Sequence, residues 1–135
     1  MKKTTFLVLL IITIFLWDCD SYASEKSVIE PCLQLIDINY CNLSISDMNA
    51  QISGYVSGNS EVTNITAKIS LQVKKGLSWT TIKEWSSNSN SDSLAYQFEW
   101  KVEKGKTYRA VANITARTKS KSESRTIKST EEKAR

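Results

Sequence analysis

Histidine is absent from this 135-residue chain, and the chain holds one proline and four glycines. The absence of histidine excludes His-ligated metal sites and mechanisms that need an imidazole base. So little proline and glycine excludes a collagen-like or proline-rich linker protein. The sequence also lacks a Gly-x-Ser-x-Gly elbow, a glycine-rich phosphate loop and a calcium-loop pattern. We therefore expect no enzyme, no catalytic residue, no metal site and no cofactor.

The first 23 residues have the pattern of a secretion signal. Two lysines follow the initial methionine, and an apolar stretch runs from Phe6 to Trp17. As a helix this stretch is about 18 Å long, shorter than the ~30 Å hydrocarbon core of a bilayer, so a retained membrane anchor is the weaker alternative. Small residues at Ser21 and Ala23 place the cleavage after Ala23. The pattern predicts a secreted protein, extracellular or associated with the cell wall, without stable membrane insertion.

Three cysteines occur, and the signal is expected to remove one of them. Cys19 follows a tryptophan and an aspartate, which disfavours lipidation. Cys32 and Cys41 remain in an exported chain, where oxidising surroundings favour a disulfide between them. Such a short loop would stabilise the fold by ~2.5–3 kcal/mol. Two free buried thiols are the alternative, and a metal site lacks the necessary ligands.

From Leu43 almost to the end, apolar and polar residues alternate with period two, and no stretch has helical spacing. Turn signals at Gly58, Gly76 and Gly105 divide the alternation into short strands, and a polar loop is expected from Ser86 to Ser93. Without an amphipathic helix, each inward face needs a second sheet as its partner. The pattern predicts an all-β fold, an antiparallel seven-strand immunoglobulin-like sandwich. We expect a signal peptide over 1–23, an N-terminal segment over 24–41, the sandwich over 42–130 and a frayed tail over 131–135.

Two resemblances add to this interpretation. The segment from Val102 to Ala112 resembles the turn and sixth strand of fibronectin type III and related immunoglobulin-like domains, in which a tyrosine at the position of Tyr108 bonds nearby backbone. Leu71-Gln72, Trp79, Trp85 and the run Gly105-Lys-Thr-Tyr-Arg resemble a pattern in small secreted proteins of Gram-positive bacteria. The second resemblance implies a fold and a location, and it carries no mechanism.

Aromatic residues offer one candidate site. Trp79, Thr81, Lys83 and Trp85 are expected to share one strand face, either as a platform for stacking ligands or, more simply, as core. Tyr55 is a weaker companion for a platform. The structural residues we expect are Trp79, Trp85, Trp100 and Tyr108.

Basic residues near the C-terminus offer a second candidate site. From Lys104 onward the chain carries ten lysines and arginines against three glutamates. This charge favours anionic polymers such as wall teichoic acids or phospholipid head groups, and nucleic acid is not expected. The alternative is a set of charges that keeps an edge strand from pairing. The candidate residues are Lys119, Lys121, Arg125 and Lys128.

Together these features indicate a small secreted β-sandwich that acts by binding, at the bacterial envelope or on an extracellular protein. The alternative is a bacteriocin-like antagonist, or a factor protecting against one, that acts by protein–protein contact.

Overall fold

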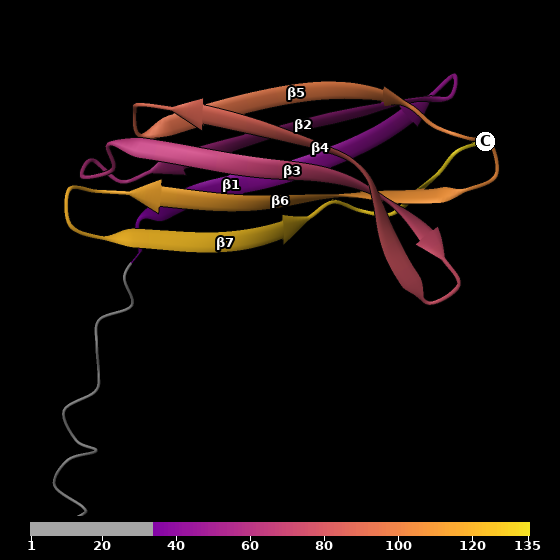
Figure 1. The fold of residues 1–135 in the computed structure, drawn as a ribbon. Coiled ribbons are helices and arrows are strands. Elements are labelled where there is room, and N and C mark those ends of the chain that lie inside the picture. Colours follow the sequence, from indigo (N-terminus) through magenta and orange to yellow (C-terminus); the bar gives the residue numbers. More distant parts are fainter. Residues whose placement is uncertain (1–33) are drawn as a thin grey trace, which may run out of the picture. The chain divides into compact units, whose positions relative to one another are not determined.

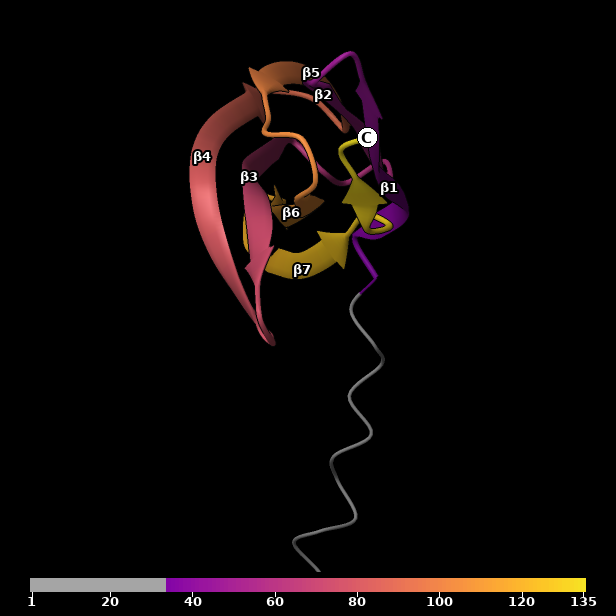
Figure 2. The ribbon, with the colours of Figure 1, turned by 90° about the vertical axis from the view of Figure 1, so that its right-hand side faces the viewer.

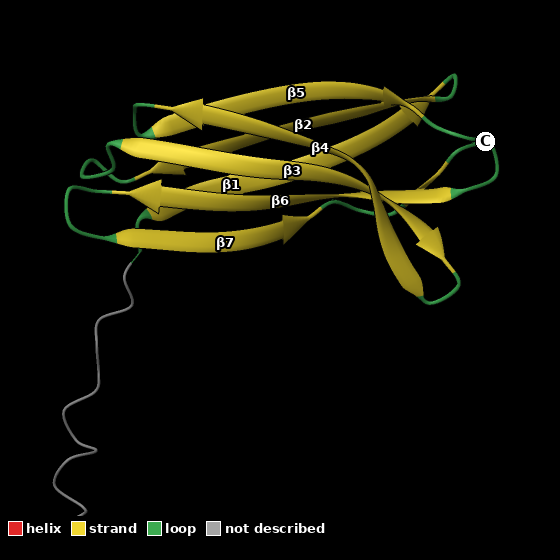
Figure 3. Ribbon diagram, in the orientation of Figure 1, coloured by secondary structure: helices red, strands yellow, loops and turns green. Residues whose placement is uncertain are grey.

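The computed structural model describes residues 34–135 as two antiparallel sheets, and these residues contain no helix (Figures 1 and 3). The three-stranded sheet has the order β1–β2–β5, formed by β1 (Ile36–Ser46), β2 (Asn49–Gly58) and β5 (Ser93–Lys101). The five-stranded sheet has the order β4–β3–β6–β7, formed by β4 (Ser78–Ser89), β3 (Asn64–Lys75), β6 (Thr107–Arg117) and β7 (Ser122–Lys128), and β8 (Glu132–Lys133) also pairs with β6. The expected signal peptide, Cys19 and Cys32 lie outside the described residues. Within residues 34–135, no helix long and apolar enough to cross a bilayer is found.

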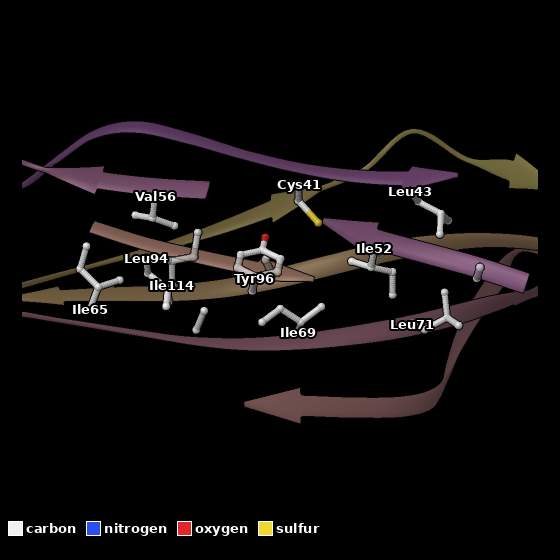
Figure 4. Packing of buried hydrophobic residues seen from close by; sticks show 14 of the residues in the cluster. Cys41, Leu43, Ile52, Val56, Ile65, Ile69, Leu71, Leu94, Tyr96 and Ile114 are labelled. Carbon is white, nitrogen blue, oxygen red and sulfur yellow. The ribbon is translucent and has the colours of Figure 1, made fainter. Parts of the chain in front are cut away.

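The predicted all-β antiparallel sandwich is confirmed. Figure 2 shows the two sheets curving around a common interior. The inward faces predicted for β2, β3 and β6 are all buried: Ala50, Ile52, Gly54, Val56, Ile65, Ala67, Ile69, Leu71, Val73, Tyr108, Ala110, Ala112, Ile114 and Ala116. Figure 4 shows the side chains of both sheets meeting in this layer. Each fully buried isoleucine or leucine contributes roughly 1.5–3 kcal/mol of hydrophobic free energy.

Position 54 requires glycine, because the ring of Tyr96 packs directly against it from the neighbouring strand. A Cβ atom at Gly54 would lie 2.1 Å from the ring and hydroxyl of Tyr96. The Tyr96 hydroxyl donates to the carbonyl of Tyr40 at 3.5 Å and lies beside the buried thiol of Cys41 (Figure 4). Burial raises the pKa of that thiol, and the hydrogen bond with Tyr96 offsets this only in part. Cys41 therefore lies in the core, and its disulfide with Cys32, which is outside the described residues, stays a prediction.

The sandwich begins earlier than predicted. Leu35 and Ile36 are buried, and β1 starts at Ile36 instead of after residue 41. A register shift between Ile36 and Ile38 interrupts the alternation at Asp37. The period-two signal is therefore weak where the first strand starts.

The predicted polar loop from Ser86 to Ser93 is wrong over its first half. The end of β4, Ser86 to Ser89, pairs with Lys68 to Ile65 of β3. The side-chain amide of Asn64 donates to the carbonyl of Ser89 at 3.1 Å. Serine and asparagine are accepted here because β4 is an edge strand, and the polar composition concealed the strand.

The predicted frayed tail is also wrong. Thr107 and Tyr108 of β6 pair with Lys133 and Glu132. Ala134 is completely buried. Its N–H donates to the carbonyl of Lys106, and its carbonyl accepts from the N–H of Gly105. A single small apolar side chain, that of Ala134, anchors this end, and one alanine does not produce a recognisable sequence pattern.

Candidate functional site

A β-bulge in β4 separates the two tryptophans that were expected to share a face. Leu71 of β3 pairs with Lys83, whereas the next residue, Gln72, pairs with Thr81, so Ile82 is the extra residue. Because a one-residue shift moves side chains to the opposite face, Trp79 and Thr81 lie on the outer face and Lys83 and Trp85 on the inner face. The predicted four-residue face is therefore wrong.

The inner group closes the gap between the edge strands β4 and β5. The Trp85 ring stacks on Phe98 with centroids 5.1 Å apart, and it meets the edge of Trp100 at 6.2 Å. The Lys83 ammonium lies 4.6 Å from the Trp100 ring. Trp85 is half-buried and packs against the core, whereas Trp100 keeps 40% of its surface exposed. Trp85 thus packs against the core, and the structural role expected of it stays a prediction.

The outer group centres on a stacked tryptophan and arginine. The Arg109 guanidinium lies 4.2 Å from the Trp79 ring, and the Lys74 ammonium lies 5.8 Å from it. Arg109 Nε donates to Gln72 Oε1 at 2.8 Å, which holds the guanidinium plane. Lys74 also forms a half-exposed ion pair of 3.9 Å with Glu131. Stacking and a hydrogen bond together orient a planar cation on this face.

Next to this pair the outer face contains buried polar and apolar side chains. Ser70 and Val111, neighbours across β3 and β6, are each only 7% exposed although they lie on the outer side of the sheet. Beyond them is an open hollow of about 480 Å³. The residues that line it carry hydroxyls, amides and one lysine that pairs with Glu84 at 3.4 Å: Thr66, Lys68, Ser86, Asn88, Asn113 and Thr115, with the inward-facing Ala67 and Ser87 between them.

The four predicted basic residues do not form one patch. Lys119 and Lys121 are exposed in the β6–β7 turn, and Lys128 is exposed on the outer face beside Val111. Arg125 faces inward across from Ile114 and forms a 2.7 Å ion pair with Glu123. Of these four residues, only Lys128 lies on the same outer face of the five-stranded sheet as Arg109.

Glu123 holds the start of β1. One of its carboxylate oxygens accepts the N–H groups of Leu35 and of Ile36, the latter at 3.1 Å. Burial by itself raises the pKa of Glu123, but these two backbone donors and Arg125 outweigh it and lower the pKa below its usual value. Arg125 and Glu123 are therefore structural.

We name the outer surface formed by Lys68, Lys74, Trp79, Arg109 and Lys128 the cationic face. Its four cations are accompanied by two carboxylates, those of Glu84 and Glu131. In the sequence, Lys68 and Lys74 are recognisable only as solvent-facing residues that alternate with the buried residues of the same strand. Their alternation with core residues of β3 was visible, but the position of Lys74 beside Trp79 and Arg109 depends on the pairing of β3 with β4 and β6, and Lys68 lies farther along the same face, opposite Asn113.

The three-stranded sheet has a different outer surface. Tyr40 and Tyr55 pair across β1 and β2 with ring centroids 6.3 Å apart, and Ile38 beside them is 56% exposed. Tyr55 is a candidate from the sequence, whereas Tyr40 and Ile38 lie in the first half of β1, which was not predicted. Among residues 34–135 there is no group of three or more side chains able to hold a metal ion.

No family model matches the chain, and no curated protein matches it. Among solved structures, the solution structure of CsgH from R. palustris matches 67% of this chain and 90% of its own, with 8% identity and a TM-score of 0.40. Similarity this low carries no functional inference.

Proposed function

We propose that this protein is exported by its leader, residues 1–23, and acts outside the cell by binding an anionic polymer of the bacterial envelope through the cationic face. It performs no catalysis in this proposal. The observation that supports it most directly is the Arg109 guanidinium, stacked on Trp79 at 4.2 Å and bonded to Gln72 at 2.8 Å. A guanidinium that is already oriented in this way loses little conformational freedom when it binds a phosphate.

The chemistry of the neighbouring hollow suits the rest of such a polymer. Teichoic acids alternate phosphates with polyols and sugars, which donate and accept hydrogen bonds. The hydroxyl and amide side chains of Thr66, Asn88, Asn113 and Thr115 offer both kinds of partner. We therefore assign phosphate binding to Arg109, Lys74 and Lys128 and polyol binding to the hollow.

Co-sedimentation of the mature protein with purified cell walls tests this function. Walls that carry teichoic acid should retain the protein, and walls stripped of it should not. Binding should weaken steeply between about 50 and about 500 mM salt, because exposed charges are screened over a few ångströms at high ionic strength. Equal retention on both kinds of wall would contradict the proposal.

Two matched variants locate the site. Arg109→Gln should lower wall retention about tenfold, the loss of one charge-assisted bidentate contact. Lys119→Gln removes the same charge from the exposed β6–β7 turn and should leave retention nearly unchanged. If both variants lose the same affinity, binding depends on total charge and not on the cationic face.

The second candidate function is contact with another protein, either as an antagonist or as a protective factor. The exposed group formed by Ile38, Tyr40 and Tyr55 favours it, because aromatic and aliphatic side chains of this kind anchor protein interfaces. The affinity of such protein–protein binding would change little with salt concentration. Tyr55→Ser would abolish it, and Arg109→Gln would not.

A further inference from the structure

Three large apolar side chains are exposed near one end of the sandwich. Leu77, at the tip of the β3–β4 hairpin, is fully exposed, Ile82 in the β4 bulge is 38% exposed and Trp100 at the end of β5 is 40% exposed. In Figure 1 this hairpin projects below the other strands in the right half of the view, and the β5–β6 connection lies above it at the right-hand end. Exposed apolar groups gathered in one place mark interaction surfaces, whereas single ones are ordinary.

Two of these side chains border an open hollow of about 320 Å³ between the sheet edges. Its floor is apolar, with Val73, Val102 and the rings of Trp100 and Tyr108, and Ile82 lies at its side. This hollow faces away from the cationic face, since Val73 belongs to the inward side of β3.

Lysines surround the apolar floor. Lys75, Lys101 and Lys106 line the hollow, and Lys83 lies over the Trp100 ring at 4.6 Å. The one carboxylate in the lining, Glu103, pairs with Lys106. The lining therefore holds one carboxylate against three lysines, with Lys83 beside them, which makes the rim positive around an apolar centre.

We propose that this end of the molecule docks reversibly on an anionic lipid bilayer surface. The docking surface, which we name the lysine rim, consists of Lys75, Leu77, Ile82, Lys83, Trp100, Lys101 and Lys106. Charge complementarity selects the partner, since each lysine near an anionic leaflet strengthens binding roughly fivefold. Leu77 enters the boundary between head groups and acyl chains, and Trp100 lies at that boundary, where amphipathic rings are enriched.

Both kinds of contact are needed for this docking. A single short apolar anchor binds bilayers only marginally, and stable association takes a second signal such as a basic cluster. The lysine rim supplies the cluster and the hairpin tip the anchor. This proposal does not depend on the wall-binding proposal, because it uses the opposite side of the β3–β4 hairpin.

Vesicle co-sedimentation of the mature chain tests the proposal. Vesicles of phosphatidylglycerol and phosphatidylcholine should bind the protein, vesicles of phosphatidylcholine alone should not, and tryptophan emission should shift to the blue on binding. Leu77→Ser should weaken binding by about tenfold or more, the loss of one buried leucine. This variant folds normally, because Leu77 makes no core contact.

Controls separate the lysine rim from the rest of the surface. Lys75→Gln combined with Lys101→Gln should weaken binding about 25-fold, whereas Arg109→Gln on the cationic face should retain it. Equal binding to neutral vesicles, unchanged binding of Leu77→Ser, or loss of binding in Arg109→Gln would each overturn the proposal. Complete competition by a soluble short-chain phosphatidylglycerol would also overturn it, because the hollow would then hold a single lipid and not a bilayer surface.

Discussion

Tyr108 satisfies a backbone group that the sandwich would otherwise leave unpaired. The side chain is 2% exposed, and its hydroxyl accepts the N–H of Glu103 at 2.9 Å. The resemblance to fibronectin type III domains implied this bond from one residue and its position, since a buried phenol needs a local backbone partner.

Tyr108→Phe should lower the free energy of unfolding by ~1–3 kcal/mol, because the Glu103 N–H loses its partner while the ring still fills its place. Urea denaturation measures the difference. Tyr40→Phe, at a half-exposed ring, is the control and should change stability by less than ~0.5 kcal/mol. Equal stability of the two variants would mean that the Glu103 N–H is satisfied by water.

The carboxylate of Glu123 makes the stability of the sandwich depend on pH. Its folded-state pKa lies below the usual value, so its contribution is fully present above roughly pH 5 and is lost as the pH falls through the folded pKa. Glu123→Gln should cost about 1–2 kcal/mol at neutral pH, the difference between charged and neutral hydrogen bonds.

Denaturation of both proteins across the acid range measures this effect. The gap between wild type and Glu123→Gln should close as the wild-type carboxylate becomes protonated. A constant gap at all pH values would show that the carboxylate charge does not hold the start of β1.

At the scale of elements, the bulge at Ile82 decides what each β4 tryptophan does. Trp85 packs against Phe98 and the core, whereas Trp79 touches Arg109 and Lys74 outside it. The run from Ser78 to Ser89 does not reveal the bulge by its pattern, because the residues on either side of Ile82 are polar or aromatic on both faces. Bulges depend on the partner strand, and the sequence of one strand does not contain that information.

Trp85→Ala should therefore destabilise the protein by ~2–3 kcal/mol, somewhat less than the loss of a fully buried tryptophan. Trp79→Ala should cost at most ~1 kcal/mol, the scale of an exposed cation–π contact. Thermal unfolding compares the two variants. Similar losses in both would place the tryptophans on one face, as the uninterrupted alternation predicted.

The strands that could be predicted are those with a continuous apolar face. In β2, β3 and β6 each second residue is buried, so period two was sufficient. The start of β1, the end of β4 and β8 were missed because they are held by a carboxylate, by side-chain amides and by main-chain pairing with β6. Such contacts leave no periodic pattern.

For the whole molecule, the two-layer fold followed from composition and alternation, but the surfaces did not. The ten cations near the C-terminus suggested one basic patch, and the fold distributes them instead. Arg125 faces inward, Arg109 joins Lys74 from another strand, and Lys106 belongs to the far side. A surface combines residues from strands distant in sequence, so pairing and register must be known before charges can be grouped.

The three proposed surfaces predict different responses to salt. Binding through the cationic face should fall steeply with ionic strength, the lysine rim should retain part of its affinity through Leu77, and contact through Tyr40 and Tyr55 should be insensitive. One salt series on each partner therefore assigns the surface before any variant is made.

The most direct test of the central claim is an NMR titration of the mature protein with a short glycerol-phosphate polymer. The account predicts amide shifts concentrated at Gln72, Arg109 and Val111 on the outer face of the five-stranded sheet, with the Arg109 Nε–H signal among the largest. Shifts concentrated instead around Tyr40 and Tyr55, or no shifts at low salt, would contradict it.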